Sequence, residues 1–204
     1  MDTYEFSPAE VRVLGVLVEK QALTPDAYPM TLNAIINACN QLTSREPVLQ
    51  LDEPDVVAAI DALSARRLIA ERQPSGSRVV KYEHRLPYEW NIEGARSATL
   101  ALLMLRGAQT AAEIRARSGR LYPFSSVAEV ENALQQLADK YPPLVQLMER
   151  QPGAREARWA HLLYGEAQIA ATAPAAESGL AARVSSLEAE VEALKARIAE
   201  LESR

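Results

Sequence analysis

Apolar positions along this chain follow the same order twice. The apolar face of one predicted helix, Val56, Ile60 and Leu63, returns 74 positions later as Val130, Leu134 and Leu137. Spacings of three and four residues are typical of a helix that packs on one side. In both halves the helix is followed by two extended stretches around a turn, which predict a β-hairpin. The pattern therefore predicts a duplicated unit of helices followed by a hairpin.

The first half predicts three helices before its hairpin. Ser7 and Glu10 form a capping box with Pro8 at the first helical position, and Thr24-Pro25-Asp26 breaks the pattern. A second helix is predicted over residues 31–41, and a third from its cap Asp52 through residue 67. Extended segments at 68–73 and 78–85, joined by a Pro/Ser/Gly turn, predict the hairpin.

The second half repeats this plan with fewer residues. Thr110 and Glu113 form another capping box that opens a short helix ending at Gly119, and Ser126 and Glu129 form a box that opens the next helix. The hairpin is predicted at 144–151 and 155–163. The offset between the halves shrinks from 86 at the first helices to 74 at the third, so the first half carries 12 additional residues there.

The last part of the chain predicts a dimerisation helix behind a linker. Residues 165–179 are rich in Ala with scattered Gly, Pro and Ser, typical of a flexible linker. A heptad seam follows, made of Leu180, Val184, Leu187, Val191, Leu194, Ile198 and Leu201. β-branched residues at one core position with Leu at the other favour a parallel two-stranded coiled coil, and the flanking charges are complementary in that pairing. The alternative is a single amphipathic helix that folds back on its own chain.

Three helices followed by a hairpin resemble a winged helix. The stretch 19–48, with Thr24-Pro25-Asp26, Tyr28-Pro29-Met30 and Arg45-Glu46-Pro47-Val48, is similar to the YceH-like family of uncharacterised bacterial proteins with two winged helices. The 152–158 turn and the terminal heptads also resemble that family. We therefore expect a mostly α fold with small β-hairpin wings (α+β). Its expected parts are winged-helix domains at 1–90 and 91–164, the linker, and a coiled-coil helix at 180–204. The resemblance implies no activity.

Composition narrows the function classes. The chain has 204 residues and a net charge of −5, distributed as −4 over 1–90, +2 over 91–164 and −3 over 165–204. General nucleic-acid binders usually have a basic footprint. Of the three segments, 91–164 is the one with a positive net charge, so an anionic ligand should prefer it. Cys39 is the single cysteine, and no secretion signal or membrane-spanning run is present, so we expect a cytoplasmic protein. The sequence contains neither a nucleophile elbow nor a phosphate-binding loop, so no motif indicates an enzyme.

Basic side chains on the two hairpins are the first candidate site. They recur at matching positions and are Arg72, Arg78, Lys81, Arg150, Arg155 and Arg158. Lys and Arg contacts to phosphates supply most non-specific nucleic-acid affinity, so these residues predict phosphate binding. The alternative is a solvated strand surface on which Glu71, Glu83, Glu149 and Glu156 pair with the cations. Both third helices carry acids near their starts, which argues against ordinary reading of a DNA groove by these helices.

A polar patch on the second helix is the second candidate. Asn33, Asn37 and Asn40 lie at helical spacing with Arg45 nearby, and Asn can read adenine edges. The alternative is a buried polar network that braces the additional residues of the first half.

His84 and His161 occupy equivalent strand positions, and we expect them to pack inside the hairpins. No metal site or cofactor is predicted.

Two functions remain open at this stage. One is a non-enzymatic regulator that dimerises in parallel and associates with DNA or RNA through its wings. The other is a scaffold that uses the same fold to bind another protein, as the acidic third helices suggest. Neither reading predicts a membrane partner.

Overall fold

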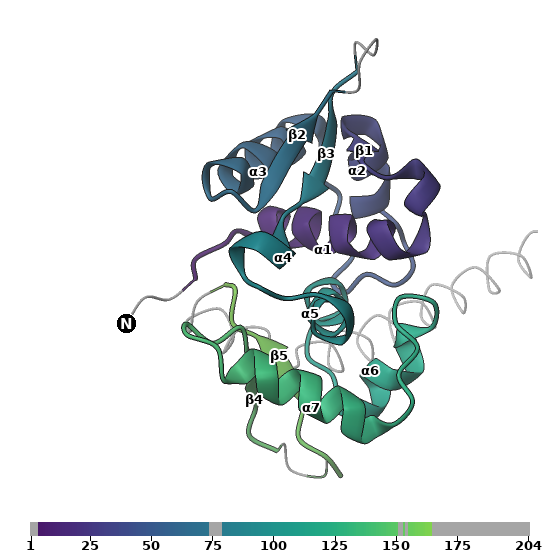
Figure 1. Ribbon diagram of the computed structural model, residues 1–204, viewed down its shortest axis with the longest axis vertical. Helices are drawn as coiled ribbons and strands as arrows, with labels where there is room; N and C mark the ends of the chain where they lie inside the picture. Colours follow the sequence, from purple (N-terminus) through teal and green to yellow (C-terminus); the bar gives the residue numbers. More distant parts are fainter. Residues whose placement is uncertain (1–3, 74–78, 151–152, 154, 165–204) are drawn as a thin grey trace, which may run out of the picture. The chain divides into compact units, whose positions relative to one another are not determined.

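Two sets of helices, each followed by a hairpin, make up the mixed α+β fold of the computed structural model (Figure 1). The structure describes residues 4–73, 79–150, 153 and 155–164. The predicted linker at 165–179, the heptad seam at 180–204 and Arg78 lie outside the described residues.

The first set begins with α1 (Pro8–Leu23) and a 3-10 turn, η1 (Pro25–Ala27). It continues with β1 (Met30–Thr31), α2 (Leu32–Cys39) and α3 (Glu53–Ala65). Strands β2 (Ile69–Arg72) and β3 (Lys81–His84) form its hairpin.

A short helix, α4 (Leu86–Glu89), leads to the second set. This set contains α5 (Gly94–Arg106), α6 (Ala111–Ser118) and α7 (Val127–Ala138). Strands β4 (Val145–Leu147) and β5 (Trp159–His161) form the second hairpin. In Figure 1 the two hairpins lie at opposite ends of the described body.

Helix starts agree with the predicted caps at three places. Ser7 caps α1 in a reciprocal box with Glu10, Asp52 caps α3, and Thr110 caps α6 in a box with Glu113. The box predicted at Ser126 and Glu129 is only half formed, because the Ser126 side chain accepts the Glu129 amide but receives no return bond. The Glu129 carboxylate instead accepts the backbone N–H and the hydroxyl of Ser125, each at 2.8 Å.

A third strand, which the sequence did not predict, completes the first sheet. β1 pairs antiparallel with β3, giving the order β1-β3-β2 with Met30 opposite Tyr82. In the second half Gln109 forms an isolated bridge with Trp159, which is the residue equivalent to Tyr82. The two halves therefore share this strand contact as well as the helices.

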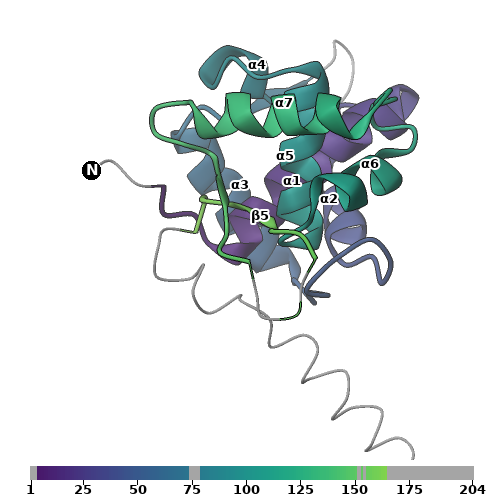
Figure 2. The same cartoon turned by 90° about the horizontal axis from the view of Figure 1, so that it is seen from below.

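Helices α1 and α5, equivalent in the duplication, pack against each other in the middle of the described body (Figure 2). Residues 10–19 of α1 and 97–105 of α5 are buried without interruption, so both helices are covered on all sides along these stretches. Gly15 allows the close approach, because a Cβ there would lie 3.1 Å from Leu105 and from Met104. Both halves consequently contribute to one continuous apolar core.

Backbone hydrogen bonds also join the two halves. The Glu46 amide, in the loop between α2 and α3, donates to the Leu105 carbonyl of α5 at 2.8 Å, and the Phe6 amide donates to the Leu163 carbonyl at 2.9 Å. The buried guanidinium of Arg12 donates to the carbonyls of Cys39 and Pro47 and so holds that loop to α1.

Within the described ranges, none of the helices combines the length and apolar character needed to cross a bilayer.

Candidate functional site

The first hairpin presents one paired cation and one partly covered cation. Arg72 is exposed, and its Nε and Nη2 donate to Glu83 Oε1 at 2.9 and 2.7 Å across the hairpin. Lys81 is half-buried in β3 between Arg72 and Thr31, and it has no carboxylate within 4.0 Å in the described part of the chain. The predicted alternative, in which Glu83 pairs with a hairpin cation, therefore describes Arg72.

The second hairpin differs because two of its arginines have no partner among the residues that the structure describes. Arg158 donates to both oxygens of Glu113, at 2.8 and 3.0 Å, and to the Ala108 carbonyl at 2.9 Å. Burial raises the pKa of the Glu113 carboxyl, but the Thr110 amide and Arg158 more than offset this and the pKa is lowered. Arg150 and Arg155 are exposed and make no side-chain hydrogen bond or ion pair to other described residues.

Further cations lie at the end of α6, a segment for which the sequence predicts no site. Arg115, Arg117 and Arg120 are exposed, and we call them the α6-end arginines. Arg115 donates to the Ser125 carbonyl at 3.3 Å and Arg117 to Gln109 Oε1 at 2.9 Å, but no described carboxylate pairs with any of the three. The corresponding first-half residues, 79 positions earlier, are Ile36, Ala38 and Gln41, which carry no charge. Comparing the two halves residue by residue would have revealed this basic surface from the sequence.

The predicted polar patch of Asn33, Asn37, Asn40 and Arg45 does not form one surface. Asn33 and Asn37 are exposed on α2, and Asn40 bonds to the backbone of Leu51 through both its amide atoms, each at 2.8 Å. The Arg45 side chain is 0% exposed. Asn40 and Arg45 therefore hold the α2–α3 loop in place.

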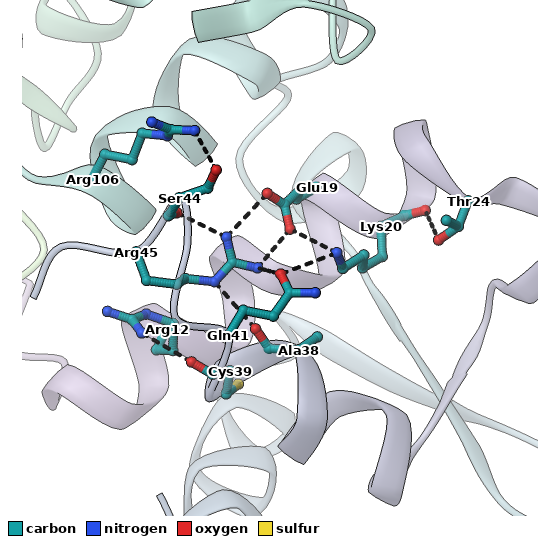
Figure 3. Close-up of polar contacts among 10 residues, drawn as sticks. All are labelled: Arg12, Glu19, Lys20, Thr24, Ala38, Cys39, Gln41, Ser44, Arg45 and Arg106. Atoms are coloured by element: carbon teal, nitrogen blue, oxygen red, sulfur yellow. Dashed lines mark hydrogen bonds and ion pairs between the residues drawn. The ribbon is translucent and has the colours of Figure 1, made fainter. Parts of the chain in front are cut away.

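Arg45 lies at the centre of a polar cluster between α1 and this loop (Figure 3). Its two terminal nitrogens donate to the Glu19 carboxylate at 3.1 and 2.7 Å, and its remaining hydrogen bonds go to Gln41 and to the carbonyls of Ala38 and Ser44. Burial raises the pKa of Glu19, but the hydrogen bonds and charges of Arg45 and Lys20 lower it further than burial raises it. On the other side of the loop, Arg106 of α5 donates to the Ser44 hydroxyl.

The exposed faces of the two third helices differ in chemistry. α7 buries Val130, Ala133, Leu134 and Leu137, and it exposes Ala128, Glu131, Asn132, Gln135 and Gln136 on the other side. The α3 residues equivalent to 131, 132 and 135 are Val57, Ala58 and Asp61, all exposed. One helix therefore presents mainly side-chain amides, and the other presents small, apolar and acidic groups.

The two histidines have the same buried position in each hairpin. His84 Nδ1 accepts the Leu86 amide at 3.4 Å and His161 Nδ1 accepts the Leu163 amide at 3.3 Å. Burial lowers the pKa of each imidazole to about 4.

Cys39 is also buried, and burial raises the pKa of its thiol to about 12, so it is a poor nucleophile at neutral pH. Among the described residues, no three His, Cys, Asp or Glu side chains are grouped to hold a metal.

Comparison with known sequences places these features in a bacterial family. Residues 6–154 match the family described as "Protein of unknown function, DUF480". A UPF0502 protein of Chromobacterium violaceum is 67% identical over 100% of this chain and 94% of its own length. UPF0502 proteins of Janthinobacterium sp. (strain Marseille) and Shewanella piezotolerans are 53% and 44% identical, over 91% and 98% of this chain and 82% and 99% of their own lengths. These matches are consistent with the YceH-like resemblance.

Proposed function

We propose a function for this chain, which belongs to the DUF480 family of proteins of unknown function: a non-enzymatic regulator that binds nucleic acid. In this proposal each half is a winged helix, and the second half carries the contacts to phosphates. The heptad seam at 180–204 joins two chains in parallel, and the dimer acts in the cytoplasm without a cofactor.

The uneven pairing of the hairpin cations supports the proposal. Arg150 and Arg155 are exposed and unpaired among the described residues, whereas Glu83 already neutralises Arg72 in the first hairpin. A phosphate that contacts Arg150 or Arg155 displaces water and counterions, and no ion pair with another described residue has to break. The α6-end arginines add three positive charges that no described carboxylate pairs with, and they lie in the same half, which has a net charge of +2 over 91–164.

Arg158 has a different role in this proposal. Glu113 and the Ala108 carbonyl already occupy its guanidinium, so it fixes β5 against the start of α6. We therefore assign phosphate contact to Arg150 and Arg155, and we regard Arg158 as a residue that positions the hairpin.

The test measures binding of a labelled random-sequence DNA duplex between about 50 and 200 mM salt. The double variant Arg150→Ala/Arg155→Ala should bind more weakly, with a salt slope about two units smaller, because each phosphate contact contributes roughly 0.9 to the slope. Arg72→Ala is the matched control and should change the slope much less. Equal effects of the two variants would contradict the assignment to the second hairpin.

A protein-binding scaffold is the second candidate function, and the exposed face of α3 favours it. Val57 and Ala58 lie there beside Asp55 and Asp61, a surface better suited to a protein than to phosphates. If the wild type binds neither duplex DNA nor RNA at about 50 mM salt, where phosphate contacts are strongest, the nucleic-acid proposal fails and the scaffold is favoured.

A further inference from the structure

The exposed face of α7 carries a pair of amides that hydrogen-bond to each other. Gln136 Nε2 donates to Asn132 Oδ1 at 3.1 Å, one helical turn away. This bond leaves Asn132 Nδ2 as a donor and Gln136 Oε1 as an acceptor, and neither has a partner among the described residues. A neighbouring donor and acceptor on one exposed helix face are suited to a ligand that offers one acceptor and one donor.

The acidic side chains of α7 repel an anionic ligand at this face less than the sequence suggests. The Glu129 carboxylate is turned back onto Ser125 and the Tyr122 hydroxyl, and the Ser125 hydrogen bonds lower its pKa. Asp139, at the opposite end of the helix, accepts a hydrogen bond from Gln135 at 2.7 Å. Glu131 is therefore the one acid on this face that makes no hydrogen bond to another described side chain.

The duplication provides an internal comparison. The α3 residues equivalent to Asn132 and Gln136, 74 positions earlier, are Ala58 and Ala62. Alanine side chains form no hydrogen bonds, so α3 lacks the donor and acceptor pair although it occupies the same place in its half. The amides are not needed to form this helix, since the equivalent helix forms with alanine at both positions.

We propose that α7 reads A·T base pairs in the major groove of duplex DNA. Adenine presents N7 as an acceptor and N6–H₂ as a donor in that groove, and Asn or Gln amides complement this pair. Asn132 Nδ2 donates to adenine N7 and Gln136 Oε1 accepts from adenine N6, while Arg150, Arg155 and the α6-end arginines contact phosphates. This inference rests on the proposed function, because it needs a duplex bound to the second half.

The experiment selects bound sequences from a random duplex library with the full-length protein. The wild type should enrich a motif that contains A·T pairs. Asn132→Ala/Gln136→Ala, which gives α7 the residues of α3, should lose this enrichment and bind the selected site roughly tenfold more weakly. Its affinity for random duplex and its melting temperature should stay unchanged. Asp61→Ala on α3 is the matched control and should leave the selected motif intact.

The possible outcomes distinguish base reading by α7 from the proposed nucleic-acid binding on which it rests. If the wild type binds random duplex but enriches no motif, or if the double alanine variant enriches the same motif, reading by α7 is overturned while nucleic-acid binding stands. If the wild type binds no duplex at all, both proposals fall. A double variant that melts at a lower temperature is replaced by Asn132→Leu/Gln136→Met, which keeps nearly the same side-chain volume without the amide donor and acceptor or any added charge, and which should lose the motif too.

Discussion

Glu19 of α1 and Arg45 of the α2–α3 loop form a two-point ion pair, with N–O distances of 3.1 and 2.7 Å. The Arg45 side chain is fully buried and the Glu19 side chain is 12% exposed. Through this pair the loop that contacts α5 is held to the central helix of the first half.

Replacing Arg45 with Met should destabilise the fold by about 3 kcal/mol, because it leaves the largely buried Glu19 carboxylate without its main partner. Glu19→Gln/Arg45→Met removes both charges and should recover a large part of that loss. Urea unfolding of the wild type, both single variants and the double variant gives the coupling between the residues. A double variant as unstable as Arg45→Met alone would show that loop packing, and not the charge pair, dominates.

The two buried histidines should make stability depend on pH. Unfolded His binds a proton near pH 6.5, whereas the folded pKa of both His84 and His161 is about 4. The unfolded state therefore takes up more protons between these values. The contribution is fully present above pH 6.5 and is lost as the pH falls towards 4.

The expected loss is roughly 2 kcal/mol per histidine between pH 7 and pH 5. His84→Asn and His161→Asn keep an acceptor for the amide two residues ahead and remove the titrating group. Each variant should flatten the pH dependence of the free energy of unfolding in this range. A variant with the same slope as the wild type would mean that its imidazole does not control the titration.

Gly15→Ala should destabilise the protein, although alanine is the better helix former by about 1 kcal/mol. The new Cβ would lie 3.1 Å from Met104 Cβ, which can move only with the backbone of α5. Overpacking of this kind typically costs about 1–3 kcal/mol. Thermal unfolding checks the prediction, with Gly119→Ala as a control for glycine replacement away from the α1–α5 contact. A rise in melting temperature for Gly15→Ala would show that the contact can relax.

Dimerisation should depend on the heptad seam at 180–204. Sedimentation at micromolar concentration should give a dimer for the full chain and a monomer for a 1–170 truncation. The reason is the seam of β-branched and Leu residues with complementary flanking charges. A monomeric full chain, or a truncation that stays fully dimeric, would refute the proposed coiled coil.

Local signals explain which elements could be predicted. Caps such as Ser7, Asp52 and Thr110 act within one helical turn, so their helices could be located from the sequence alone. Strand β1 has only two residues and shows no alternation, and its pairing depends on β3, which lies 50 residues further along the chain. The burial of α1 on all sides likewise depends on α5 and not on its own pattern.

The candidate site was predictable to a smaller extent for a similar reason. The hairpin arginines could be identified from the sequence by residue type. Whether each one is free to contact a phosphate depends on neighbours that only the fold brings together. Arg158 meets Glu113 from 45 positions away, while Arg150 meets no described carboxylate. Arg45 follows the asparagines of α2 closely in sequence, which predicts a shared surface, yet its partner Glu19 lies 26 positions earlier.

The bonds from Phe6 to Leu163 and from Glu46 to Leu105 have a consequence for how the protein opens. Each bond links one half to the other, and α1 packs against α5, so unfolding of either half would expose apolar side chains of the other. We therefore expect the two repeats to unfold together and not as separate units. Hydrogen exchange should show this directly: the amides at the centres of α1 and α5 should exchange with one common free energy, equal to that of global unfolding.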